Sequence, residues 1–167
     1  MISLKVEKLY SEEDVTMSEA KVNEFIANNI DDSMDATTKI KAFHDYVINT
    51  SVYDQEKADL IEKHGDTGVY RSHKAVGPLI DGISLCSGYS DAMKIFLDKM
   101  GIVNYKISND NHIWNLVYVN GEWLHLDLTW DDPVTNTGEN LLLYKFFLID
   151  TGTLHSLDET GHTYNRI

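Results

Sequence analysis

Three side chains of this sequence have the types needed for an activated sulfur nucleophile: Cys86, His112 and Asp127. A cysteine can supply the attacking sulfur, a histidine can take and return its proton, and an aspartate can orient the histidine. Cys86 is the single cysteine of the sequence, which excludes an internal disulfide and a cysteine-rich zinc module. The chemistry therefore depends on whether the fold brings the three groups together.

A helix is predicted from about residue 86 to residue 100, with Gly101 as its C-terminal stop. Its apolar stripe consists of Tyr89, Ala92, Met93, Phe96, Leu97 and Met100. Cys86 is then at the helix N-terminus, where unpaired backbone N–H groups favour the thiolate. A buried, inert cysteine is the alternative, because lone cysteines commonly have that role.

The histidine and the aspartate fall in a predicted β-hairpin over residues 112–130. The dipeptide Asn120-Gly121 is a strong signal for a two-residue turn between two strands. That turn pairs His112 with Thr129 and puts Asp127 on the same face, diagonal to His112. Cross-strand diagonals are roughly 7–8 Å apart, so an imidazole and a carboxylate that lean together can meet.

The two faces of this hairpin differ in chemistry. The face expected to pack in the core carries Ile113, Val117, Val119, Leu124, Leu126 and Leu128. The other face is both aromatic and polar, and carries His112, Trp114, Leu116, Tyr118, Trp123, His125, Asp127 and Thr129. The candidates for the wall of a site or for substrate contact are Trp114, Tyr89, His125 and Trp130. Packing or surface roles are the alternative for each of these residues.

The rest of the sequence predicts helices, short pieces and one domain over residues 1–167. Thr16–Glu19 fits a capping box for a first helix, and a second helix is expected from Asp35 to about Asn49. Residues 54–81 are polar and rich in glycine, which predicts a long loop or short helical pieces.

The composition is that of a globular protein with an acidic surface. The chain is 43% hydrophobic and 25% charged, and its net charge is −13. Lys and Arg are not clustered, so nucleic acid is not an expected partner. No apolar run approaches the roughly 18 residues of a membrane span, and no signal peptide is visible. Solubility accounts for the acidity, with preference for a basic substrate as the alternative.

Three segments closely resemble the signature segments of the transglutaminase-like superfamily, in its short microbial form. They are Cys86–Tyr89, His112–Asn115 and Asp127–Pro133. Upstream, His44–Val47 and Tyr53-Asp54 resemble the helix and the Tyr-Asp step that precede the cysteine, and downstream Tyr144–Ile149 resembles the strand after the Asp-Pro turn. The resemblance covers residues 35–150 and rests on the order and spacing of the segments together.

The resemblance implies an α+β, papain-like transglutaminase core, in which a helix bearing the nucleophile packs on an antiparallel sheet. It assigns Cys86 as nucleophile, His112 as general base and acid, and Asp127 as the orienting carboxylate. It also implies acyl transfer on a peptide or protein substrate, including one associated with the cell wall. Hydrolysis by a peptidase or amidase is favoured, protein crosslinking is the alternative, and a binding module without turnover is the alternative of another class.

No cofactor or metal is expected. The sequence is too short for the extra β-domains of large animal transglutaminases, so their calcium dependence is not carried over. The residues Cys86, His112, His125 and Asp127 are all zinc ligand types, but they lack a closely spaced ligand pair. The resemblance favours an extracellular or cell-surface location, and the cytoplasm stays open.

The oxyanion site is incompletely specified. No Gln, Asn or Trp occupies residues 77–85, where papain-like enzymes commonly place a side-chain donor. The backbone N–H of Cys86 is one expected donor, and the second donor is open.

Overall fold

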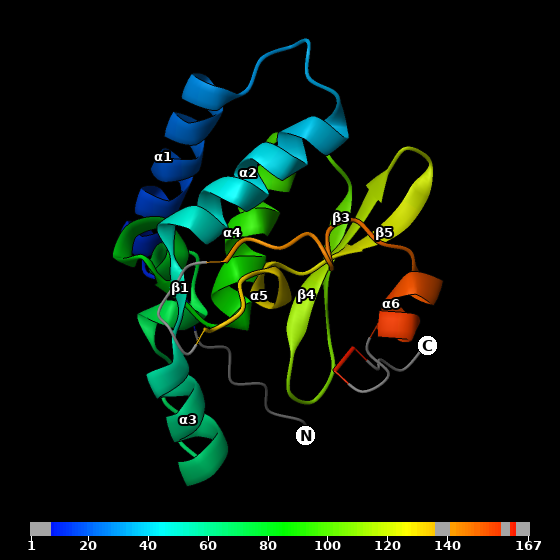
Figure 1. The fold of residues 1–167 in the computed structure, drawn as a ribbon. Helices are drawn as coiled ribbons and strands as arrows, with labels where there is room; N and C mark the ends of the chain where they lie inside the picture. The colour runs from blue at the N-terminus through cyan, green and yellow to red at the C-terminus, as the bar shows by residue number, and fades with distance from the viewer. Residues whose placement is uncertain (1–7, 136–140, 158–160, 163–167) are drawn as a thin grey trace, which may run out of the picture.

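The computed structural model describes residues 8–135, 141–157 and 161–162. Its helices and strands are α1 (Glu12–Asn29), α2 (Ala36–Thr50), β1 (Val52–Tyr53), α3 (Gln55–His64), β2 (Ile83–Ser84), α4 (Cys86–Lys99), β3 (Asn104–Ser108), β4 (Ile113–Val119), β5 (Glu122–Leu126), α5 (Leu128–Asp131) and α6 (Thr151–Leu157) (Figure 1). Two short helical segments, the 3₁₀ helix η1 (Arg71–His73) and the π-helix η2 (Gly77–Asp81), precede β2. The mixture of helices with an antiparallel sheet confirms the predicted α+β class.

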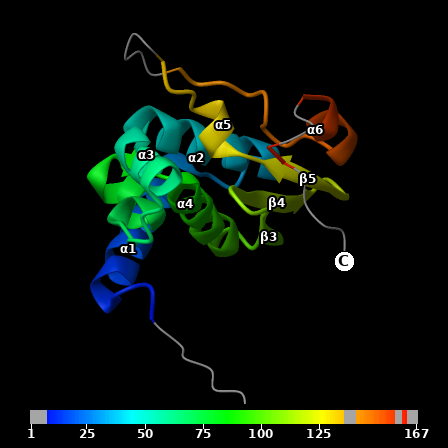
Figure 2. The same cartoon turned by 90° about the horizontal axis from the view of Figure 1, so that it is seen from below.

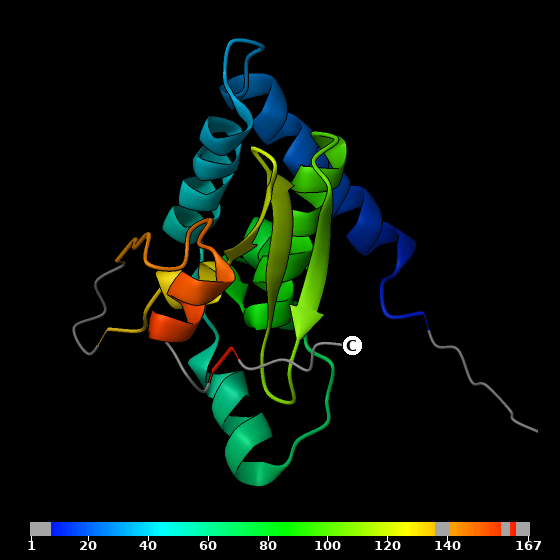
Figure 3. The same ribbon diagram turned by 90° about the vertical axis from the view of Figure 1, so that its right-hand side faces the viewer.

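The helix α4 packs against the antiparallel sheet β3-β4-β5 and against α1 and α2. Figure 3 shows the sheet in front of α4, with α1 and α2 to either side. Three phenylalanines join the helices: Phe43 stacks on Phe96 with ring centroids 4.4 Å apart, and Phe25 meets Phe43 edge-on at 5.1 Å. Val117 of β4 and Leu126 of β5 are fully buried in the same core. The helix that begins at Cys86 is therefore held from both sides by apolar packing.

The predicted hairpin register is correct for five residue pairs, from Val119 opposite Glu122 to Asn115 opposite Leu126. The turn residues have positive φ angles, 55° at Asn120 and 87° at Gly121, as a type I′ turn requires.

Beyond Leu126 the predicted strand pairing is wrong. The chain leaves the sheet because Asp127 caps α5, so Thr129 lies in a helical turn and does not face His112. The single further bridge joins His125 to Ile149, among the residues that the structure describes. The strand expected at Tyr144–Ile149 is thus reduced to that bridge, and α6 packs beside β5 (Figure 2).

Of the other predicted element boundaries, some are correct and some are wrong. The first helix begins at Glu12 rather than just after Thr16, since Ser11 and Asp14 form the capping box. The second helix begins as predicted, with Asp35 as its N-cap. The predicted helix at Cys86 is also correct. Within residues 54–81 the chain forms α3 and the short helical segments η1 and η2, as the alternative of short helical pieces predicts. No helix in the described ranges is long and apolar enough to cross a membrane.

Candidate active site

Cys86 is the first residue of α4, and its side chain is partly exposed. The N-cap residue, Leu85, has no side chain that can accept from the first-turn N–H groups. Leu85 N donates to the Ser72 carbonyl at 2.8 Å, which holds this turn against η1. Gly88 fits there because a Cβ would lie 2.6 Å from Ser84 Oγ and even closer to the Ser72 carbonyl. The first turn of α4 thus packs directly against the backbone of η1.

Asn109 positions His112 through the loop between β3 and β4. Its Oδ1 accepts from the backbone N–H of Asn111 at 3.0 Å and of His112 at 2.8 Å. The His112 ring lies flat against Trp114, with centroids 5.6 Å apart and planes 15° apart. Its side chain is 11% exposed, so the imidazole is held between a buried indole and the surface.

Asp127 meets His112 from the start of α5. Its Oδ1 accepts from the backbone N–H groups of Thr129 at 2.9 Å and Trp130 at 3.3 Å, as an N-cap does. Its Oδ2 lies 2.5 Å from His112 Nε2. The structure therefore brings together the two side chains that the hairpin predicted as neighbours, although a helix cap and not a strand pair holds Asp127.

His112 and Asp127 stabilise each other's charged form. Burial opposes the charge on His112, but hydrogen bonds to Asp127 and Cys86 outweigh it and raise the pKa of His112 to about 10. Burial likewise opposes ionisation of Asp127, yet hydrogen bonds from His112 and His162 lower its pKa to about 2. The arrangement favours an imidazolium between a carboxylate and the sulfur of Cys86.

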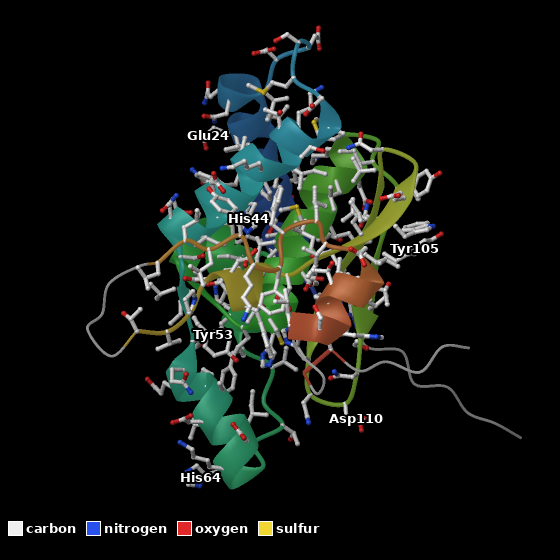
Figure 4. The ribbon with its side chains drawn as sticks, turned by 45° about the vertical axis from the view of Figure 1, so that its right-hand side comes forward. Glu24, His44, Tyr53, His64, Tyr105 and Asp110 are labelled. Atoms are coloured by element: carbon white, nitrogen blue, oxygen red, sulfur yellow. The ribbon has the colours of Figure 1, made fainter. Side chains whose placement is uncertain are left out.

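Two cavities meet at this group. One of about 640 Å³ includes His112 and Trp130 in its lining, and another of about 630 Å³ includes Cys86. Both are lined by Tyr53, Asp110 and Asn111. Figure 4 labels Tyr53, just before α3, and Asp110, in the loop between β3 and β4. The imidazole and the sulfur thus line two neighbouring cavities, which together are termed the cleft.

The comparisons with known proteins concern this same core. A solved structure described as "Crystal structure of a TGase" (a transglutaminase) matches with a TM-score of 0.60 and 21% sequence identity. The match covers 72% of this chain and 33% of that one. The chain has a transglutaminase-like fold.

The fold resemblance stated from the sequence is thereby confirmed. No protein-family model matches the sequence, and no curated protein matches it. The chain spans about a third of the length of the solved transglutaminase. At this identity the likeness shows the fold, and the roles of Cys86, His112 and Asp127 stay predictions.

The four predicted wall residues of the candidate site lie at different depths. Trp130 is 36% exposed and lines the larger cavity. Trp114 is fully buried under His112 and donates from Nε1 to His125 Nδ1 at 3.0 Å. Burial lowers the pKa of His125 to about 4, which suits a neutral acceptor. Tyr89 is buried in the core and donates to the Asp132 carboxylate. Of these four residues, Trp130 is the one that lines either cavity, and the other three are buried, so their role as wall residues stays a prediction.

His162 was not predicted from the sequence. Its Nε2 lies 2.7 Å from Asp127 Oδ2, and its side chain is fully buried. The two residues are 35 positions apart, and no helix or strand periodicity links them. The sequence offers a single hint, which is that His162 follows Gly161 and belongs to no predicted element.

The zinc alternative is not supported by the geometry. His125, one of its four members, is engaged with Trp114 and Thr151 instead. A different group, His112, Asp127 and His162, has its donor atoms within 4.8 Å of one another. The separations of 2.5 and 2.7 Å within that group are hydrogen-bond lengths. Two ligand atoms that share a tetrahedral zinc at about 2.1 Å would be roughly 3.4 Å apart.

Proposed function

We propose that this protein is a cysteine-dependent acyl-transfer enzyme that acts on amide bonds of peptides or proteins. The single observation that carries the proposal is the His112–Asp127 pair beside Cys86 at the start of α4, with His112 lining one cavity and Cys86 lining its neighbour. Such a constellation activates a thiol, and an open cleft admits an acyl group to it.

In the first half-reaction the Cys86 thiolate attacks the carbonyl carbon of the amide, and a carbon–sulfur bond forms. Because Nε2 of His112 faces Asp127, Nδ1 is the ring nitrogen that serves the sulfur and the leaving group. The imidazolium gives its proton to the amine nitrogen, the carbon–nitrogen bond breaks, and a thioester on Cys86 remains. Asp127 keeps the tautomer and orientation of the ring throughout.

In the second half-reaction water or an amine attacks the thioester. His112, now neutral, takes a proton from the incoming nucleophile, and the Cys86 thiolate leaves. Water gives hydrolysis and an amine gives crosslinking, so the acceptor alone separates the two outcomes. Hydrolysis is the favoured one, with crosslinking as the alternative.

The oxyanion is stabilised by the backbone N–H of Cys86 at the helix start and by the phenol of Tyr53. Tyr53 supports this role because it lines both cavities. Burial, followed by the charge on Cys86, raises the pKa of Tyr53 to about 12, so the phenol keeps its proton. Replacement Tyr53→Phe should lower kcat by about a hundredfold, in the range known for loss of one oxyanion donor.

The charge of the cleft favours a neutral or cationic substrate. The side chains that line the two cavities include the carboxylates Glu62, Asp110 and Asp132 and, among the described residues, no Lys or Arg. A polyanionic ligand would be repelled by this lining and by the net charge of −13.

A peptide library rich in Gln and Asn side chains, screened with and without a primary amine, tests the proposal. Mass spectrometry would follow peptide cleavage, loss of ammonia and incorporation of the amine. We expect turnover by the native protein and none by Cys86→Ala, with a thioester adduct trapped on the native protein at early times.

The result that overturns the proposal is turnover that survives Cys86→Ala, or no turnover and no adduct with any library member. The second of these would favour a binding module that keeps the fold. Amine incorporation in excess of hydrolysis would move the assignment from hydrolase to crosslinking transglutaminase.

A further inference from the structure

The carboxylate of Asp127 serves two imidazoles at once. Its Oδ2 lies 2.5 Å from His112 Nε2 and 2.7 Å from His162 Nε2, while Oδ1 accepts from the two α5 backbone N–H groups. Because Asp127 is only 2% exposed, these four contacts supply the hydrogen bonds that water would otherwise make.

His162 is enclosed by aromatic rings. It meets Trp114 edge-on at 4.8 Å and Trp130 at 4.6 Å, and stacks near Phe146 at 5.2 Å with planes 24° apart. The His112 ring stands nearly perpendicular to it at 5.3 Å. Rings on several sides restrict the imidazole, so its Nε2 is directed at the carboxylate.

The segment that carries His162 is tied to the loop that carries His112. Asn109 Nδ2 donates to the Gly161 carbonyl at 2.7 Å, and the Oδ1 of the same amide accepts from His112 N. One side chain thus fixes the spacing of the two histidines that share Asp127.

We propose that His162 is a positioning residue that holds the Asp127 carboxylate in place for His112 and draws part of its charge. The proposal rests on the acyl-transfer function given above. His162 touches neither the sulfur nor the substrate in this role, and it acts through Asp127.

The expected consequence is that His162 keeps the pKa of His112 lower than Asp127 alone would set it. An N–H donated to Oδ2 withdraws charge that would otherwise stabilise the His112 imidazolium. The groups that set this balance are Cys86 on α4, Asp127 at the start of α5 and His162, with Asp110 at the rim of the cleft. Without His162 the carboxylate would hold the imidazolium more strongly and the carboxylate itself would be less constrained.

The test compares His162→Phe, which keeps a ring in the aromatic enclosure but has no donor, with His162→Gln, whose amide N–H can reach the carboxylate. His64→Phe, at the exposed end of α3, is the matched control. Ring ¹H–¹⁵N NMR from pH 5 to 11 gives the titration of His112, thermal unfolding gives stability, and steady-state kinetics gives kcat and KM.

We expect His162→Phe to move the His112 titration to higher pH and to lower kcat by about tenfold with KM little changed, as loss of a hydrogen bond to a charged group does. His162→Gln should restore both, and His64→Phe should match the native protein. A His112 titration in His162→Phe that superposes on the native curve would overturn the proposal. Equal losses in the Phe and Gln variants, together with equal drops in Tm, would also overturn it, because His162 would then act through packing alone. The NMR readout needs no turnover, so it stands even if the acyl-transfer function fails.

Discussion

Two histidine–aspartate pairs lie close together in this fold, and they differ in what surrounds them. His112 meets Asp127 at 2.5 Å, next to Cys86 and a cavity. His44 of α2 meets Asp131, the last residue of α5, at 3.2 Å, and both side chains are fully buried. The two aspartates are at opposite ends of one helical turn, so the same short segment supplies both pairs.

The two carboxyl groups respond in opposite directions. Burial is the leading influence at both, but Asp127 has two imidazoles and two backbone donors, and its pKa falls to about 2. Asp131 has His44 and the Phe146 backbone N–H at 2.9 Å, and burial prevails, so its pKa is raised. The difference teaches that a His–Asp pair in itself indicates no chemistry. The His112–Asp127 pair differs from the His44–Asp131 pair in its number of donors, its adjacent thiol and the cavity beside it, and such features mark a candidate functional site.

The largest expected difference between the two pairs is in kcat when the aspartate of each pair is replaced. Asp127→Asn should lower kcat by about a thousandfold or more, because the amide no longer stabilises the imidazolium or fixes its tautomer. Asp131→Asn should leave kcat of the folded protein within about tenfold of native. Steady-state kinetics with a substrate from the peptide screen decides, and equal losses in the two variants would remove the distinction between the pairs.

The reverse difference is expected for stability. His44 stacks on Tyr144 at 5.6 Å and meets Phe147 edge-on at 5.1 Å, and His44→Phe would leave the Asp131 carboxyl buried without its imidazole. We expect a loss of about 3 kcal/mol in the free energy of unfolding, with activity per folded molecule retained. His112→Phe should cost about 1 kcal/mol and abolish activity, since Asp127 keeps His162. Urea unfolding at pH 7 measures both, and a larger loss for His112→Phe would contradict the comparison.

The smallest expected difference is in the dependence of stability on pH. Asp127, with its lowered pKa, contributes stability that is complete above its ordinary value of 3.8 and is lost as the pH falls through about 2. Asp131, with its raised pKa, takes up a proton more readily when folded, so its contribution is lost as the pH rises above 3.8. Asp131→Asn should therefore flatten the fall in stability from pH 4 to pH 7 and make the variant relatively more stable at pH 7. Denaturation curves at pH 4 and 7 test this, and an unchanged slope would count against the raised pKa.

Local sequence signals predicted much of the site. The helix that begins at Cys86, the Asn120-Gly121 turn and the register of β4 with β5 follow from periodicity and turn chemistry, which act over a few residues. The contact between His112 and Asp127 is also predicted from the sequence, but through a strand pairing that the structure does not form. An aspartate followed by free N–H groups can cap a helix as readily as it can continue a strand, and here the cap prevails.

The contacts that sequence reasoning missed are long-range. His44 and Asp131 are 87 positions apart, and His162 and Asp127 are 35 apart. Neither pairing follows from helix or strand periodicity, since each is made by tertiary packing of segments that carry no shared pattern. For Trp114 and His125 the sequence left packing open as the alternative to a wall role, and contacts of His125 with the distant residues Ile149 and Thr151 accompany their burial.

The most direct test of the central claim is the alkylation of Cys86 by iodoacetamide at pH 6, with free cysteine as the reference. If His112 holds the sulfur as a thiolate, the native protein should react at least about tenfold faster than free cysteine, which is almost entirely protonated at that pH. The advantage should vanish in His112→Ala and persist in His44→Phe. A native rate no faster than that of free cysteine, unchanged by His112→Ala, would contradict the account.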